Sequence, residues 1–184
     1  EQRIGPAKIT PPPGSFLQAT QHGETSLIET VGNILKSASP VLDLFSGCGT
    51  FSLPLAQMAE IHAIEGEADM LAALDKAWRK TQGVKKISQE KRELFRRPLL
   101  PDELNKFEAA VIDPPRAGAQ AQVTMLAKTN IKTLAYVSCN PVSFARDAKI
   151  LTDAGYSLEA VTPVDQFRWS YHVELVGAFH KAAA

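Results

Sequence analysis

One nucleophilic residue and one acidic residue in the second half of the chain could together carry out covalent catalysis. Cys139 directly follows an apolar run, and Asn140-Pro141 predicts a turn into a helix that would present the thiol. A cysteine at such a helix mouth can be stabilised as a nucleophilic thiolate, whereas the commoner fate of a cysteine is to be buried and inert. Glu174 lies early in an apolar stretch, where a carboxylate is unexpected and could act as a general base, with His172 as the alternative.

A glycine-containing turn predicts a nucleoside-binding site. In Asp43–Thr50 (DLFSGCGT), Gly47 and Gly49 permit a tight turn, and the predicted helix after it points its N-terminus at a ligand. Ser52 stands where the dinucleotide pattern Gly-x-Gly-x-x-Gly needs its third glycine, which makes a nicotinamide cofactor less favoured than a smaller nucleoside. Glu65, roughly 20 positions after the turn, could accept hydrogen bonds from both ribose hydroxyls.

Three further segments could complete a site. Glu93 could accept a hydrogen bond from an adenine amino group, or it could be a surface charge. Asp113-Pro114-Pro115-Arg116 predicts a stiff lip that holds its carboxylate still for substrate positioning. The aromatic residues of Asp165–Glu174 could line a pocket for a base, or they could pack over a sheet.

The elements that must position these residues alternate along the chain. Short apolar runs predict strands at Val41–Phe45, Ile61–Ile64, Ala109–Ile112 and Thr133–Val137, with a weaker candidate at Val84–Ser88. Helical periodicity falls at His22–Lys36, Phe51–Ala59, Glu67–Thr81, Ala119–Thr129 and Val142–Ala154, whereas residues 1–14 are expected to form a loop. The alternation predicts an α/β fold with a mostly parallel, doubly wound sheet. Two last strands, Tyr156–Val161 and His172–Phe179, have no helix between them and predict an antiparallel C-terminal pair.

Composition limits the class of protein. The chain has 184 residues, of which 45% are hydrophobic and 22% charged, as in a soluble globular domain. Twenty basic residues balance twenty acidic ones, so the basic excess of a tight nucleic-acid binder is absent. The two cysteines, Cys48 and Cys139, predict neither a disulfide framework nor a metal site, and no apolar run reaches the roughly 20 residues of a membrane span. We expect a cytoplasmic monomer, with Cys48 as filler.

Four segments together resemble the RNA (uracil-5-)-methyltransferase family, which acts on tRNA and 23S ribosomal RNA. They are Asp43–Leu55, Asp113–Ala119, Ser138–Pro141 and His172–Glu174, and they occur in the same order. The resemblance runs from about residue 13 to residue 180 and implies a Rossmann-like, class I S-adenosylmethionine-dependent methyltransferase fold. It implies that Cys139 is the nucleophile and Glu174 the proton-abstracting base. The positions implied to bind S-adenosylmethionine are Gln18, Phe45, Thr50, Glu65, Glu93 and Asp113, with Gly47 in the glycine turn.

The resemblance also has departures that bear on domain organisation. Thr20 stands where many members have Asn, and Thr50 and Glu93 replace Asn in some members. Members usually carry an N-terminal RNA-binding β-barrel domain and a central insertion, and some hold an iron–sulfur cluster through four cysteines; this chain has none of these. We therefore expect a fragment or an engineered start, with residues 1–21 as an extension that contributes to the cofactor site, 22–181 as the catalytic domain and 182–184 as a tail.

The implied reaction is methyl transfer from S-adenosylmethionine to C5 of a uridine in RNA, through a covalent bond between Cys139 and C6. We expect the RNA, ribosomal more than transfer RNA, to be held by the missing RNA-binding domain. One alternative is a methyltransferase for an amino group or for cytosine C5; amino-directed enzymes follow Asp-Pro-Pro with an aromatic residue, where Arg116 stands here. The other is a cofactor-binding fragment that is inactive without its RNA-binding domain.

Overall fold

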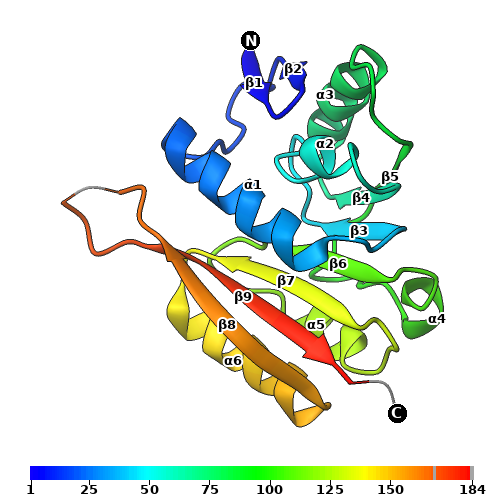
Figure 1. The fold of residues 1–184 in the computed structure, drawn as a ribbon, viewed down its shortest axis with the longest axis vertical. Coiled ribbons are helices and arrows are strands. Elements are labelled where there is room, and N and C mark those ends of the chain that lie inside the picture. Colours follow the sequence, from blue (N-terminus) through cyan, green and yellow to red (C-terminus); the bar gives the residue numbers. More distant parts are fainter. Residues whose placement is uncertain (168, 183–184) are drawn as a thin grey trace.

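A seven-stranded sheet forms the centre of the computed structural model, which describes residues 1–167 and 169–182 (Figure 1). The strand order is β5-β4-β3-β6-β7-β9-β8. The parallel part consists of β3 (Val41–Leu44), β4 (Ile61–Glu65), β5 (Ile87–Lys91), β6 (Ala109–Ile112) and β7 (Thr133–Ser138). The antiparallel part consists of β8 (Tyr156–Val164) and β9 (Glu174–Lys181). The predicted α/β architecture with its C-terminal antiparallel pair is thus confirmed.

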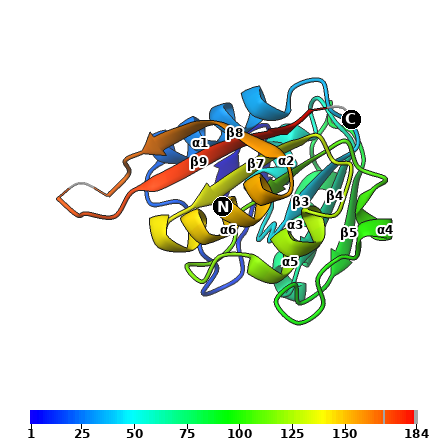
Figure 2. The same cartoon turned by 90° about the horizontal axis from the view of Figure 1, so that it is seen from below.

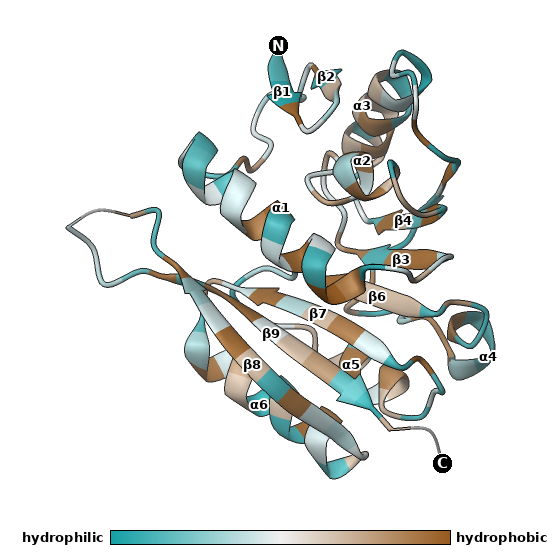
Figure 3. Ribbon diagram, in the orientation of Figure 1, coloured by the Kyte–Doolittle hydropathy of each residue, from teal (hydrophilic) through white to brown (hydrophobic). Residues whose placement is uncertain are grey.

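Helices cover both faces of this sheet, and each face has its own hydrophobic core. One core includes residues of α1 (Gln21–Leu35), α2 (Ser52–Leu55) and α3 (Ala68–Arg79). The other includes residues of α4 (Pro101–Leu104), α5 (Gln120–Leu126) and α6 (Pro141–Asp153). Figure 2 shows α1 and α6 on opposite sides of the strands between them, and Figure 3 shows how hydrophobic residues gather on the central strands. In the described part of the chain, no helix combines the length and apolar character that a bilayer crossing requires.

Strand periodicity decides which side chains face which core. In β3, Val41 belongs to the core under α1, whereas Leu42 and Leu44 belong to the opposite core. Because side chains alternate along a strand, Asp43 points to the same face as Val41. The Ser52 hydroxyl, at the start of α2, donates a hydrogen bond to Asp43 there, at 2.6 Å.

The structure corrects several predicted boundaries. Residues 1–14 were expected to be a loop, but β1 (Gln2–Ile4) and β2 (Ala7–Ile9) pair as an antiparallel hairpin. Its apolar residues alternate over too few positions for the pattern to stand out beside the proline-rich stretch that follows. β5 begins three residues later than predicted, because it is an edge strand whose sequence, ISQEK, is mostly polar. The helices predicted at Phe51–Ala59 and Ala119–Thr129 are shorter, and α4 was not predicted at all.

Candidate active site

A cavity of about 550 Å³ lies at the carboxyl ends of the parallel strands, where α/β sheets bind their ligands. The structure brings every predicted site residue to its wall: Gln18, Phe45, Gly47, Thr50, Glu65, Glu93, Asp113, Cys139 and Glu174. These residues come from the ends of five strands, the start of β9 and the segment before α1. The volume suits a nucleoside-sized ligand with room beside it for a second small group.

The glycine turn after β3 has the backbone conformation that its sequence predicts. Gly47 and Gly49 both have positive φ, of 53° and 93°. A Cβ on Gly49 would lie 2.5 Å from a methyl carbon of Leu74 in α3, so this position requires glycine for space as well as for conformation. Phe45 also has a positive φ, of 63°, which costs a non-glycine residue about 1–2 kcal/mol.

The Glu65 carboxylate is fixed by backbone amides. Its Oε1 accepts hydrogen bonds from the N–H groups of Gly66 (2.7 Å) and Glu67 (3.0 Å), and its Oε2 accepts one from Gly47 (2.9 Å). Since a carboxylate offers about four acceptor sites, one remains for a ligand hydroxyl. The carboxylate is therefore held rigidly between the glycine turn and the end of β4.

Aromatic side chains line the part of the cavity near Glu93. The Glu93 carboxylate accepts a hydrogen bond from the Phe95 N–H at 3.0 Å, and the rings of Phe45 and Phe95 lie 5.4 Å apart between centroids. Phe95 and Phe16 are 45% and 69% exposed although both border the cavity. Sequence reasoning missed these two residues, and the signal available was a lone phenylalanine among charged or turn-forming neighbours.

Two carboxyl groups have raised pKa values: Asp113, which is half-buried at the cavity wall, and Asp43, which is fully buried in β3. Burial raises the pKa of Asp113 to about 8, with further contributions from the negative charges of Glu174 and Asp43. Burial also raises the pKa of Asp43 to about 7, against the lowering effect of its hydrogen bonds with Ser52. The Asp43 Oδ1 atom has no hydrogen-bond partner. Near neutral pH, Asp113 is therefore mostly protonated and Asp43 partly protonated, whereas an exposed aspartate would have lost its proton.

The strand register brings the candidate nucleophile and base together. β7 pairs antiparallel with β9, with Ser138 opposite Leu175, so the next position in this register sets Cys139 opposite Glu174. Glu174 is 4% exposed, and burial raises its pKa. The pKa of the Cys139 thiol is also raised, first by burial and then by the charge of Glu174, while nearby Arg116 lowers it. The ligand-free site thus favours a protonated thiol beside a carboxyl group.

The segment between β8 and β9 differs from its predicted role. None of its described aromatic residues lines the cavity. Trp169 and Tyr171 are exposed, and the ring centroids of Phe167 and His172 lie 6.3 Å apart. The sequence left open whether these residues line a base pocket or pack over the sheet; in the structure they do not border the cavity, and Trp169 and Tyr171 are too exposed to pack over the sheet. His172, the alternative base, does not border the cavity either. Arg168, in the same segment, lies outside the described residues.

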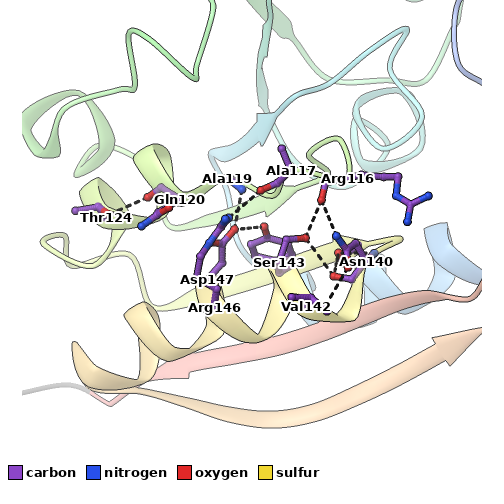
Figure 4. A network of polar contacts seen from close by, with 12 residues as sticks. Arg116, Ala117, Ala119, Gln120, Thr124, Asn140, Val142, Ser143, Arg146 and Asp147 are labelled. Atoms are coloured by element: carbon purple, nitrogen blue, oxygen red, sulfur yellow. Dashed lines mark hydrogen bonds and ion pairs between the residues drawn. The ribbon is translucent and has the colours of Figure 1, made fainter.

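A polar network joins the Asp113–Ala119 loop to the start of α6 (Figure 4). The Asn140 side chain caps α6 by accepting from the Val142 N–H, and its Nδ2 donates to the carbonyl of Arg116 at 2.9 Å. The Ser143 hydroxyl donates to the same carbonyl at 3.0 Å. The backbone of Arg116, a residue of the cavity wall, is therefore tied to the residue that follows Cys139.

Deeper in the network, Asp147 of α6 holds the end of the same loop. Its Oδ2 accepts from the Ala119 N–H at 2.7 Å and from the Tyr136 hydroxyl at 2.6 Å, and its Oδ1 accepts from Arg146 at 2.8 Å. Asp147 is fully buried, and at Gly118 a Cβ would lie 2.6 Å from its Oδ2. Sequence reasoning missed Asp147, because its partners lie up to 28 positions away along the chain. Across residues 1–167 and 169–182, no three His, Cys, Asp or Glu side chains are placed to hold a metal ion.

Comparison with known proteins gives a consistent result. Residues 10–182 match the family model described as tRNA (uracil-5-)-methyltransferase. An uncharacterized RNA methyltransferase of Mesorhizobium japonicum is 51% identical over 97% of the chain, and the 23S rRNA (uracil(1939)-C(5))-methyltransferase of Shewanella halifaxensis is 35% identical over 94%. These matches span 43% and 39% of the two relatives, so the chain covers less than half of their length.

A solved structure resembles this fold over most of the chain. The Pyrococcus abyssi tRNA (uracil-54, C5)-methyltransferase, in complex with S-adenosyl-L-homocysteine, superimposes with a TM-score of 0.78 at 27% identity. The match covers 91% of this chain and 40% of the Pyrococcus chain. The two chains therefore share this fold over most of the present chain and over less than half of the Pyrococcus chain.

Proposed function

Because the chain belongs to the tRNA (uracil-5-)-methyltransferase family, we propose that it transfers a methyl group from S-adenosylmethionine to C5 of a uridine in RNA. The observation that carries this proposal is the meeting of Cys139 and Glu174 at one cavity, through the β7–β9 register. The activities named for the relatives, on 23S rRNA and on tRNA, support RNA as the substrate class.

The cavity wall fits S-adenosylmethionine. Glu65 is held by three amides, and its one remaining acceptor site would take a hydrogen bond from a ribose hydroxyl. Phe45 and Phe95 offer apolar surfaces for an adenine ring, with the Glu93 carboxylate beside them. The turn at Gly47 has no atom within 4 Å of where a Cβ would lie, which leaves the backbone open to a ligand. The bound cofactor would supply an electrophilic methyl group on a sulfonium.

The chain's own residues would supply the covalent chemistry. Uracil C5 is a weak nucleophile, so the Cys139 thiolate first adds to C6, and the C5=C6 electron pair moves toward C5 and O4. C5 takes the methyl group, and the Glu174 carboxylate removes the C5 proton. The double bond re-forms as the C6–S bond breaks, which returns the thiolate. A uracil reaches this cavity only when it is unstacked from its neighbours, in a loop or by flipping.

The raised pKa of Cys139 constrains the order of these reaction steps. The thiol is protonated in the empty site because of burial and the adjacent Glu174 charge. The thiol must therefore lose its proton before it can add to C6, which makes deprotonation the first of the chemical steps.

The test is transfer of a labelled methyl group from S-adenosylmethionine to unmodified RNA, followed by nucleoside analysis. We expect labelled 5-methyluridine from the full-length protein, and none from Cys139→Ala, whose affinity for S-adenosylmethionine should stay within about twofold of the wild type because the methyl-transfer chemistry alone is lost. Label in an amino group or in 5-methylcytidine would refute the proposed base, and normal turnover by Cys139→Ala would refute the covalent step.

The RNA partner is proposed by class, with recognition outside this chain. Basic and acidic residues balance at twenty each, and non-specific RNA affinity rests on net positive charge. The chain also spans less than half of its curated relatives. We propose that additional parts of the full-length protein hold the RNA, and that the isolated chain binds S-adenosylmethionine but methylates RNA slowly.

A further inference from the structure

Gln166, just after β8, makes a buried contact with a residue of the cavity wall. Its side chain is 5% exposed, and its Nε2 donates a hydrogen bond at 2.6 Å to the Oε1 of Gln18, across 148 positions of sequence. Gln18 borders the cavity, whereas Gln166 does not. The Gln18 carbonyl oxygen thereby accepts its hydrogen bond from the side away from the cavity, and the Gln18 NH₂ group remains available to donate to a ligand in the cavity.

The N-terminus of α1 explains why Gln166 adopts this orientation. The Gln166 Oε1 atom is buried without a hydrogen-bond partner, and it lies 2.5 Å from where a Cβ on Gly23 would stand, in the first turn of the helix. The first N–H groups of a helix carry a partial positive charge that favours an oxygen over an NH₂ group. The Gly23 N–H donates to the Thr20 hydroxyl and not to Oε1, so the helix end favours Oε1 in this place through its partial charge alone, and Nε2 faces Gln18.

Gly23 provides the space that this arrangement needs. A Cβ there would also come within 2.7 Å of the Gln166 Cβ, closer than real side-chain atoms approach. Gly23 has an ordinary helical conformation, so its backbone does not require glycine. The close approach of Gln166 is thus the physical reason for a glycine inside the first turn of α1.

We propose that Gln166 is a positioning residue, which turns the Gln18 amide so that its NH₂ group donates into the cavity. This inference rests on the proposed function and deepens it. The ligand atom that it selects is an acceptor oxygen, either a carbonyl of the target base or the carboxylate of S-adenosylmethionine. An amino group in the same place would meet a donor and be rejected.

The decisive variant is Gln166→Glu. A carboxylate can only accept from Gln18, so the Gln18 amide must rotate and present its oxygen to the cavity. The ligand then loses one hydrogen bond, and its acceptor oxygen faces the Gln18 oxygen. Either the affinity for S-adenosylmethionine or kcat/KM for RNA should therefore fall by about 10- to 100-fold. The carboxylate is favourable at the helix N-terminus, so the Tm should not fall. If Gln166 only stabilised the fold, Gln166→Glu would instead lower the Tm and leave ligand binding and turnover of the folded protein unchanged.

Gly23→Ala and Gly32→Ala form a matched pair in the same helix. Alanine at position 23 displaces Gln166 and should reproduce the functional loss of Gln166→Glu. At position 32 the added Cβ meets only the Met58 methyl carbon, at an ordinary 3.5 Å, so this variant should keep wild-type function. Gln166→Met, which keeps the length but removes the hydrogen bond, should give a smaller loss than Gln166→Glu.

The measurements are the Kd of S-adenosylmethionine by calorimetry and kcat/KM for methylation of unmodified 23S rRNA and tRNA transcripts by the full-length protein. A weaker Kd identifies the cofactor carboxylate as the acceptor, and an unchanged Kd with a lower kcat/KM identifies the base carbonyl. Both values within twofold of wild type in Gln166→Glu would overturn the proposal. A wild-type protein that binds the cofactor but makes no 5-methyluridine would overturn the proposed function instead, and the Kd alone would then decide the role of Gln166.

Discussion

The two cysteines differ in surroundings although both border the cavity. Cys48 is 3% exposed, within the glycine turn, and burial raises the pKa of its thiol. Cys139 follows β7 and lies opposite Glu174 in the strand register, with Arg116 as a nearby cation. Only Cys139 therefore has both a proton acceptor and a positive charge beside it, as a reversible nucleophile requires.

Replacing Glu174 with Gln should allow Cys139 to add to C6 of the uracil but prevent the later cleavage of the C6–S bond. Without a carboxylate to remove the C5 proton, the bond between Cys139 and C6 cannot break, so turnover should fall about 10²- to 10⁴-fold. Denaturing electrophoresis with labelled RNA should then reveal a covalent protein–RNA complex. The double variant Cys139→Ala, Glu174→Gln is the control and should form none. A Glu174→Gln protein that turns over normally would remove Glu174 from the mechanism.

Among the elements, α6 links two motifs that lie far apart in sequence. It begins two residues after Cys139; its Ser143 hydroxyl donates to the carbonyl of Arg116, and its Asp147 carboxylate accepts from the N–H of Ala119. The Asp113–Ala119 loop is thereby held by a helix rather than by its own two prolines alone. Positions of the nucleophile and of the acidic lip thus depend on one shared element.

Asp147→Ala should destabilise the chain by about 3 kcal/mol, because it leaves the Tyr136 hydroxyl and the Ala119 N–H buried without partners. Asp153→Ala, in the same helix, removes only an exposed ion pair with Lys149 and should cost less than about 0.5 kcal/mol. Urea unfolding followed by circular dichroism would measure both. Equal losses for the two variants would show that the Asp147 network contributes no net stability.

The N-terminal hairpin anchors the segment that brings Phe16 and Gln18 to the cavity. Ile9 of β2 is 1% exposed in the core that α1 and α3 share. Ile9→Ala should therefore cost about 2–4 kcal/mol and weaken S-adenosylmethionine binding as the anchor loosens. Lys8→Ala, on the exposed side of the same strand, is the control and should change stability by no more than about 0.5 kcal/mol. An Ile9→Ala protein as stable as Lys8→Ala would contradict this anchoring role; thermal unfolding with and without the cofactor tests both.

The sequence predicts elements well where the physical signal is local. The apolar runs of β3, β6 and β7 are continuous because both faces are covered, and the rule that ligands bind at strand ends led directly to Glu65, Asp113 and Cys139. The β1–β2 hairpin and β5 gave weak signals, because they are short or polar. Gln166 and Asp147 could not be identified, since their roles depend on partners that only the folded chain brings near.

For the molecule as a whole, two aspartates with raised pKa values link stability to pH. Asp43 and Asp113 have folded-state pKa values of about 7 and about 8, above the ordinary value of an unfolded aspartate. The folded state therefore binds more protons than the unfolded state between roughly pH 4 and pH 8. Their contribution to stability is fully present below the unfolded pKa and is lost as the pH rises through the folded values.

The ligand-free chain should accordingly lose stability as the pH rises from about 4 to about 8, by at most about 1.4 kcal/mol per pH unit for each group. Asp43→Asn should remove part of this slope, so that the Tm difference between variant and wild type becomes more positive with rising pH. Asp153→Asn, on the exposed surface of α6, should leave the slope unchanged. Scanning calorimetry at several pH values tests this, and parallel curves for wild type and Asp43→Asn would refute it.

The β7–β9 ladder has a consequence for how such a chain tolerates insertions and deletions. The separation of Cys139 and Glu174 is set by hydrogen bonds between two strands, not by the number of residues that connect them. Loops between α6 and β8, or between β8 and β9, can thus gain or lose residues over evolutionary time with the reacting pair left in place. A single residue added within β9 would instead turn the carboxylate to the other face of the sheet.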